Sequence, residues 1–262
     1  MCIRDRRIIH NSVDATELGR IKTPDVALCA DAGFVARQLV GQLGSKPSVI
    51  SNASKQKWLD HVKTVKETTE AELRSKLSDQ YAWLQAIRDE VPRDGIVVDE
   101  VTQMGYVGRF GFPVYEPRTY ITPGYQATLG YGFATALGAA HARRDVPVVN
   151  YTGDGGALYT LNELATAVKH NIPLTTIVFV DGHFGNVRGF QRDNYNERYI
   201  ATDLHNPDFV KLAESFGVTG LRAESPEALR KELRNAINSR VPTLIEVPVG
   251  EFNPPMGIHS DP

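Results

Sequence analysis

The stretch VPVVNYTGDGGA, residues 146–157, runs an apolar segment directly into a cluster of glycines. The apolar residues 146–151 predict a buried β-strand, and residues 158–170 predict a helix opened by the capping-box spacing of Thr160 and Glu163. Glycines let backbone amides approach a bound anion, and the start of a helix favours negative charge. The stretch therefore predicts a phosphate-binding turn between a parallel strand and a helix.

Asp154 stands inside that turn. A carboxylate repels phosphate unless a divalent cation bridges the two groups, and hard cations prefer oxygen ligands. Asp181 directly follows the next apolar strand, residues 174–180. A helix of ~12 residues travels roughly 18 Å down the sheet, and a strand of ~7 residues travels roughly 23 Å back. A right-handed crossover therefore returns Asp181 to the sheet edge that holds Asp154, and we predict a magnesium and phosphate site there.

Each half of this pattern has a simpler interpretation. Asp181-Gly182 is an ordinary turn signal, and residues 153–156 could form only a tight turn between a strand and a helix. The two halves together, joined by a strand–helix–strand unit, favour the metal and phosphate site. A dinucleotide site is disfavoured because Gly130 and Gly132 lack a third glycine and no strand leads into them. A P-loop is excluded because no Gly-Lys-Ser/Thr sequence is present.

Working outward from this centre, apolar strands alternate with helices from Asp79 onward. The alternation predicts an α/β fold with a parallel sheet covered by helices on both faces. We expect strands over residues 96–98, 146–151, 174–180, 218–223 and 243–247, and helices over residues 81–89, 129–143, 158–170, 208–216 and 226–239. Residues 182–207 form a long polar stretch, which is either a lid over the site or a surface excursion that contains a short helix.

The first part of the chain contains two short strands, residues 8–10 and 26–29, and a helix over residues 34–43. These elements are too few to form an independent core. We expect residues 1–43 to be the end of a central domain, 44–78 to be a linker with a polar helix, and 79–262 to be the domain that holds the site.

The composition is that of an ordinary globular protein, with 42% hydrophobic residues and a net charge of −2. Such a charge offers no field that would favour nucleic acid or an anionic membrane. No apolar run approaches the ~18 residues that span a bilayer, and no signal peptide is evident. Cys2 and Cys29 fit neither a disulfide framework nor a zinc spacing. We expect reduced thiols in a cytoplasmic protein, with Cys29 buried.

The motifs resemble the thiamine diphosphate (ThDP) binding domain of the acetolactate synthase, pyruvate oxidase and benzoylformate decarboxylase superfamily. In that family an oxygen ligand at a strand end follows the Gly-Asp-Gly motif, as Asp181 follows Asp154. Further segments resemble the elements around this motif, namely residues 129–140, 162–167, 207–213 and 242–247, and residues 8–43 resemble the end of the family's central domain. The resemblance implies a ThDP- and magnesium-dependent enzyme that decarboxylates a 2-oxo acid, with or without carboligation to a second carbonyl.

The resemblance also implies roles for particular residues. The side chains of Asp154 and Asp181 and the carbonyl of His183 would bind magnesium, while the His183 imidazole either contacts substrate or is solvated. Leu129 would force the cofactor to bend, which brings its aminopyrimidine against the thiazolium carbon. The implied cofactor contacts are Thr102, Gln103, Ala127, Leu129, Gly153, Asp154, Gly155, Gly156, Ala157, Asp181 and His183. Asp99 and Glu100 also end a strand near the site, and we interpret them as solvated.

Three departures from the family pattern stand out. The second metal ligand is usually Asn, and here it is Asp181. Acetolactate synthases carry Trp at the position of Phe190, which leaves the acceptor oxo acid open. The activating Glu of the family lies in a pyrimidine-binding domain that we do not find in this sequence, so the catalytic residue is unknown.

We therefore expect the chain to supply the diphosphate-binding half of a site in a homodimer or tetramer. The other half would come from a pyrimidine-binding domain, in the full-length protein or a partner subunit. FAD use and the choice between decarboxylase and carboligase stay open. The alternatives are a non-catalytic ThDP-binding or oligomerisation module, a 2-oxo acid decarboxylase without carboligation, and an unrelated magnesium-dependent phosphate-ester enzyme.

Overall fold

The computed structural model describes residues 7–44 and 51–252. The chain groups into two compact units, with the division between Lys63 and Thr64. The helix α2 (Asn52–Lys76) runs across this division. It begins inside the stretch that we predicted as linker, of which residues 45–50 lie outside the described residues.

The first unit contains the predicted order of strand, strand and helix. β1 (Ile9–Ser12) pairs in parallel with β2 (Val26–Cys29), and a short 3-10 helix, Ala15–Glu17, lies between them in sequence. α1 (Ala32–Leu43) begins after Asp31, whose side chain accepts a hydrogen bond from the amide of Phe34 and so satisfies an unpaired donor of the first turn. The prediction that Cys29 is buried was wrong, because its side chain is exposed in this unit.

The second unit is built on a six-stranded sheet in which every pairing is parallel. Its order is β4-β3-β5-β6-β8-β7. The strands are β3 (Ile96–Val98), β4 (Tyr120–Ile121), β5 (Val148–Gly153), β6 (Leu174–Val180), β7 (Thr219–Arg222) and β8 (Thr243–Pro248). The predicted α/β fold with a parallel sheet is confirmed.

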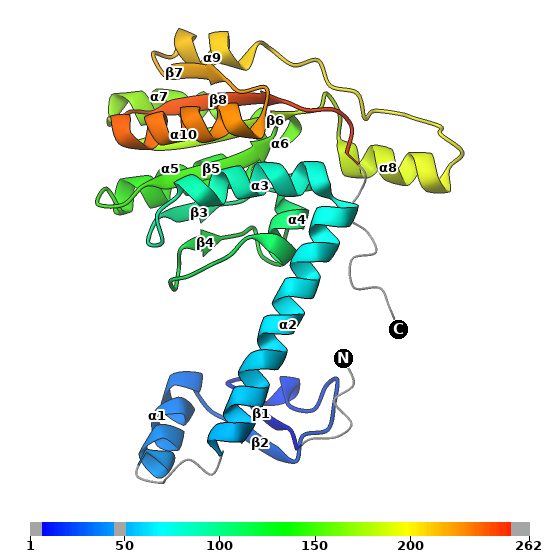
Figure 1. Ribbon diagram of the computed structural model, residues 1–262, viewed down its shortest axis with the longest axis vertical. Helices are drawn as coiled ribbons and strands as arrows, with labels where there is room; N and C mark the ends of the chain where they lie inside the picture. The colour runs from blue at the N-terminus through cyan, green and yellow to red at the C-terminus, as the bar shows by residue number, and fades with distance from the viewer. Residues whose placement is uncertain (1–6, 45–50, 253–262) are drawn as a thin grey trace. The chain divides into compact units, whose positions relative to one another are not determined.

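Helices cover both faces of this sheet (Figure 1). Successive strand residues point to opposite faces, so Val97 and Val149 belong to one apolar cluster while Val98 and Val148 belong to the other. The first cluster is covered by α3 (Ser78–Glu90), α4 (Gln103–Gly111) and α10 (Pro226–Ser239). The second is covered by α5 (Tyr131–Ala142), α6 (Asp154–Ala157), α7 (Leu164–Lys169) and α9 (Phe209–Ser215).

The single helix predicted over residues 158–170 was wrong. α6 ends just before this range, and the range itself contains a 3-10 turn over Leu161–Glu163 and the short α7. The Thr160 hydroxyl donates to the carbonyl of Gly130, 3.3 Å away, rather than capping the turn. Thr160 therefore makes a tertiary contact and does not cap the turn.

α4 and β4 of the second unit were missing from the prediction. α4 contains three glycines in nine residues, which weakens its helical pattern, and β4 has only two residues. The polar stretch 182–207 contains α8 (Gly185–Asn194), as the surface-excursion interpretation expected. No helix among the described residues is long and apolar enough to cross a membrane.

Candidate cofactor and metal site

The two predicted metal ligands lie at one edge of the sheet. β5 and β6 are neighbours, and Gly153 at the end of β5 pairs with Phe179 near the end of β6. Asp154 and Asp181 follow these positions and line the same cavity of about 320 Å³. The prediction that Asp181 lies at the sheet edge that holds Asp154 is confirmed, because the two residues follow neighbouring parallel strands and line one cavity.

Most of the predicted cofactor contacts line this cavity. They are Thr102, Gln103, Ala127, Leu129, Gly153, Asp154, Gly155, Gly156, Asp181 and His183. Ala157 does not line it and is buried in the core cluster beneath. The sequence did not indicate the apolar part of the wall, which is formed by Met104, Tyr106, Phe184, Val187, Val249 and Phe252.

Three donors hold the carboxylate of Asp154. The amide of Gly155 donates to Oδ1 at 2.9 Å, and the amide of Gly182 donates to Oδ2 at 2.8 Å. The side chain of Asn206 also donates to Oδ2, with Nδ2 at 2.6 Å. The amide of Gly155, a residue of the predicted phosphate-binding turn, therefore donates to Asp154.

The carboxylate of Asp181 has a raised pKa. Burial raises its pKa to about 6, a hydrogen bond from the His183 amide opposes this rise, and repulsion from Asp154 adds to it. The amide nitrogen of His183 lies 3.0 Å from Asp181 Oδ1, and the ring nitrogen Nδ1 lies 2.7 Å from the Asp181 carbonyl oxygen. Two carboxylates that face one cavity and repel each other suit a divalent cation, which prefers oxygen ligands and removes the repulsion.

The side chains alone do not complete a metal site. Within residues 7–44 and 51–252, no group of three or more His, Cys, Asp or Glu side chains could hold a metal ion. A cation at Asp154 and Asp181 would need further oxygen ligands from the backbone, as we expect for the His183 carbonyl, or from a bound phosphate. The Gln103 amide oxygen is buried without a hydrogen-bond partner among the described residues, so the cavity wall also holds an unsatisfied polar atom.

The glycines of the turn are required by packing as well as by any ligand. A Cβ on Gly155 would lie 2.8 Å from the Phe184 ring, and one on Gly156 would lie 3.1 Å from Glu100. Gly130 adopts a positive φ of 83° beside Leu129, and Ala127 adopts a φ of 47°. Residues 153–156 therefore form a tight turn, as the simpler interpretation expected, and this turn also brings backbone to the surface of the cavity.

Asp99 and Glu100, which we interpreted as solvated, are buried at 0% and 1% exposure. Glu100 Oε2 accepts a hydrogen bond from the amide of Gly132 at 2.7 Å. Burial raises the pKa of Glu100, and the amides of Gly132 and neighbouring residues lower it. Glu100 thus fixes the start of α5, directly after the segment that carries Leu129.

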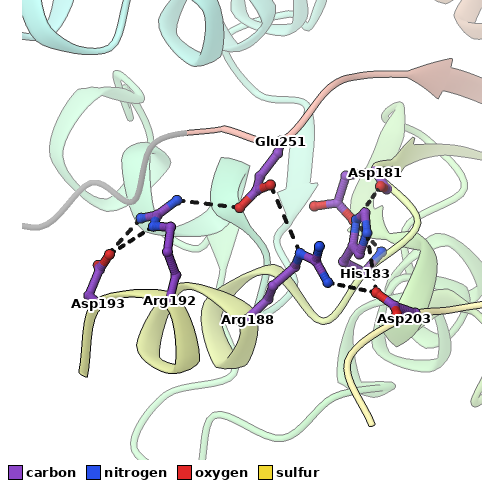
Figure 2. Close-up of polar contacts among 7 residues, drawn as sticks. All are labelled: Asp181, His183, Arg188, Arg192, Asp193, Asp203 and Glu251. Atoms are coloured by element: carbon purple, nitrogen blue, oxygen red, sulfur yellow. Dashed lines mark hydrogen bonds and ion pairs between the residues drawn. The ribbon is translucent and has the colours of Figure 1, made fainter. Parts of the chain in front are cut away.

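Ion pairs hold α8 and the segment that follows it (Figure 2). Arg188 Nη1 lies 2.7 Å from Asp203 Oδ1, and its guanidinium stacks over the Tyr199 ring. His183 Nε2 lies 3.5 Å from the same Asp203 oxygen, and Arg188 also faces Glu251 at 4.0 Å. These contacts connect the loop after β6 to residues that lie far along the chain.

The comparisons with known proteins agree with this geometry. The family described as "Thiamine pyrophosphate enzyme, C-terminal TPP binding domain" matches residues 100–247, which contain both aspartates and most of the sheet. The chain belongs to this family. Membership in the thiamine pyrophosphate enzymes confirms the resemblance to the acetolactate synthase and benzoylformate decarboxylase superfamily that the motifs indicated.

Individual thiamine pyrophosphate enzymes resemble the chain over nearly all its length. The acetolactate synthase large subunit of Parasynechococcus marenigrum is 33% identical, and the match covers 93% of this chain and 39% of that protein. The probable acetolactate synthase large subunit of Methanococcus aeolicus is 30% identical, with 92% and 42% covered. The solved structure of a thiamine diphosphate-dependent 4-hydroxybenzoylformate decarboxylase from Rhodococcus jostii RHA1 has a TM-score of 0.71 at 26% identity, with 94% and 44% covered. The chain thus spans about two fifths of the length of these relatives.

Proposed function

We propose that this chain binds the diphosphate of ThDP together with Mg²⁺, and that it serves decarboxylation or carboligation of a 2-oxo acid. The observation that carries the proposal is the pair Asp154 and Asp181, which line one cavity beside the glycine turn. These two side chains and the carbonyl of His183 would hold the metal. ThDP would supply an electron sink at the reacting carbon.

The protein's own part in the proposed function is to bind and orient. Leu129 lines the cavity and is still 37% exposed, so it can support the middle of a bent cofactor. Phe184, Val187 and Phe252 give the cavity an apolar wall that would exclude water from the reacting group. The acetolactate synthases that the motifs resemble carry Trp at the position of Phe190, so this position would bear on whether the acyl fragment passes to a second carbonyl. Phe190 itself is exposed and is not among the residues that line the cavity.

A calorimetric titration of ThDP into the full chain tests the binding. We expect affinity at least about tenfold higher with Mg²⁺ than with a chelator present, because the metal joins the carboxylates to the diphosphate. Asp154→Ala should remove this metal dependence, whereas the exposed Asp145→Ala should retain it. Equal ThDP affinity with and without metal would refute the site.

We also propose that a pyrimidine-binding domain, from a second copy of the full-length protein or a partner subunit, completes the site. An apolar rim formed by Leu129, Leu158 and Tyr159 supports this proposal. A Cβ on Gly130 would lie 2.8 Å from Tyr159 Cβ, so the two parts of the rim are adjacent. Supplying a pyrimidine-binding domain from a relative and finding no turnover of 2-oxo acids would instead favour a non-catalytic binding module.

A further inference from the structure

Asn206 approaches the Gly-Asp-Gly turn from 52 residues further along the chain. The segment 202–206 reaches it by pairing antiparallel with the loop after β6, where His183 forms a β-bridge with Asp203. The Phe184 amide donates to the Thr202 carbonyl and the Leu204 amide to the Gly182 carbonyl, both at 2.8 Å. The contacts of Asp203 with Arg188 and with His183 in Figure 2 add to this attachment.

The Asn206 side chain contacts Asp154 from outside the cavity. Its Nδ2 lies 2.6 Å from Asp154 Oδ2, and it is not among the residues that line the cavity. Its Oδ1 is buried without a partner in the described part of the chain. The amide orientation is determined, because exchanging its oxygen and nitrogen would bring two acceptor atoms together at that distance.

The hydrogen bonds leave Asp154 a restricted capacity for further ligands. A carboxylate oxygen accepts about two hydrogen bonds or metal contacts. Oδ2 already accepts from Gly182 and Asn206, while Oδ1 accepts only from Gly155. Asp154 therefore has one acceptor position left for a cation, on Oδ1.

We propose that Asn206 is a positioning residue that makes Asp154 a ligand through one oxygen and so favours Mg²⁺ over Ca²⁺ in this site. The inference rests on the proposed function. Mg²⁺ is small, requires near-octahedral geometry and takes single carboxylate oxygens, whereas Ca²⁺ accepts more ligands and often binds both oxygens of one carboxylate. Removing the Asn206 amide frees the second position on Oδ2, which lets the carboxylate turn and offers both oxygens.

The test titrates Mg²⁺ and Ca²⁺ separately into the full chain at a fixed saturating ThDP concentration. We expect Asn206→Ala to lower Mg²⁺ affinity about tenfold, as is typical for residues that orient a metal ligand, while Ca²⁺ affinity changes by less than about threefold. Asn206→Leu fills the space without a donor and should behave in the same way. Asn235→Ala removes an exposed asparagine on α10 and should leave both affinities unchanged.

The ratio of the two affinities is the deciding quantity. Both metals meet the same preparation, so a loss of folded protein lowers both affinities and cancels in the ratio. An unchanged ratio in the Ala and Leu variants, beside a wild type that binds ThDP with Mg²⁺, would overturn the role of Asn206 alone. A wild type that shows no metal-dependent ThDP binding would overturn the proposed function and this inference with it.

Discussion

Asp99, directly after β3, is a fully buried carboxylate whose two oxygens have different surroundings. Oδ2 accepts a hydrogen bond from the Tyr120 hydroxyl at 3.1 Å, and that hydroxyl lies 2.7 Å from the hydroxyl of Tyr151. Oδ1 has no partner among the described residues. Burial raises the pKa of Asp99 to about 6, and the Tyr120 hydrogen bond partly opposes the rise.

This raised pKa predicts how stability depends on pH. The folded state keeps the Asp99 proton to higher pH than the unfolded chain, so the contribution of this group falls as pH rises from 3.8 to about 6. Asn at this position does not titrate. Between pH 4 and pH 7, we therefore expect the free energy of unfolding of the wild type to fall by about 1 to 3 kcal/mol relative to that of Asp99→Asn.

Urea unfolding of the metal-free chain, followed by tryptophan fluorescence at several pH values, measures this difference. Asp145→Asn is the matched control, because Arg143 lowers the pKa of Asp145 to about 2 and its titration falls below the window. A difference between Asp99→Asn and wild type that stays constant from pH 4 to 7 would contradict the prediction.

The interpretation of Asp99 and Glu100 as solvated was wrong, because other elements cover both side chains. Whether an acid at a strand end is buried depends on what packs over it. Here the cover is α4, whose Gly105 lies against the Glu100 carbonyl, and Tyr120 of β4. Both elements have weak sequence patterns, so their absence from the prediction removed the cover as well.

At the scale of elements, α5 packs close to β3 and β5 where it begins and is open further along. A Cβ on Gly132 would lie 2.8 Å from Asn150 Nδ2 and 2.9 Å from Glu100 Oε2. A Cβ on Gly138 would meet nothing within 4 Å. The same helix therefore contains one glycine required by packing and one that only weakens the helix.

Alanine at these two positions should have opposite effects. We expect Gly132→Ala to destabilise the second unit by about 1–3 kcal/mol, since buried side chains must shift. Gly138→Ala should stabilise it by about 0.5–1 kcal/mol, because alanine is the better helix former. Thermal denaturation of both variants measures the effects, and a similar shift in melting temperature for both would contradict the assignment.

The strands were the most predictable elements. The predicted residues 96–98 and 174–180 coincide with β3 and β6, because a parallel strand covered on both faces is apolar throughout. The helix over residues 158–170 was the largest error. Residues 161–163 form a 3-10 turn, and only Leu164–Lys169 is α-helical. Thr160, the expected cap residue, instead donates to the carbonyl of Gly130, a partner thirty positions away that no local pattern indicates.

At the scale of the whole molecule, the sheet order explains why much of the site could be predicted. Asp154 and Asp181 follow neighbouring parallel strands, so spacing and crossover handedness were enough to bring them together. Asn206 could not be found in this way, since it reaches Asp154 through an irregular segment. Its position depends on the antiparallel pairing of His183 with Asp203, which has no periodic signal in the sequence.

The apolar rim defined by Leu129, Leu158 and Tyr159 leads to a prediction about assembly. Leu158 is 42% exposed and Tyr159 is 62% exposed, and with Leu129 they form a group of exposed apolar side chains. If a second chain covers the rim, Leu158→Glu should weaken self-association about tenfold or more. Sedimentation measures this, with Val241→Glu as a control, because Val241 is similarly exposed but precedes β8 at the opposite end of the strands.

The position of β8 in the sheet has a consequence for how the protein is made. β7 precedes β8 in the chain, yet it joins the sheet only through β8, which lies between β6 and β7. During synthesis on the ribosome, β7 therefore has no neighbour to pair with until residues 243–248 have emerged. Until then the outer edge of β6 has no strand to pair with. This half of the sheet can therefore form only after nearly all of the second unit has been translated.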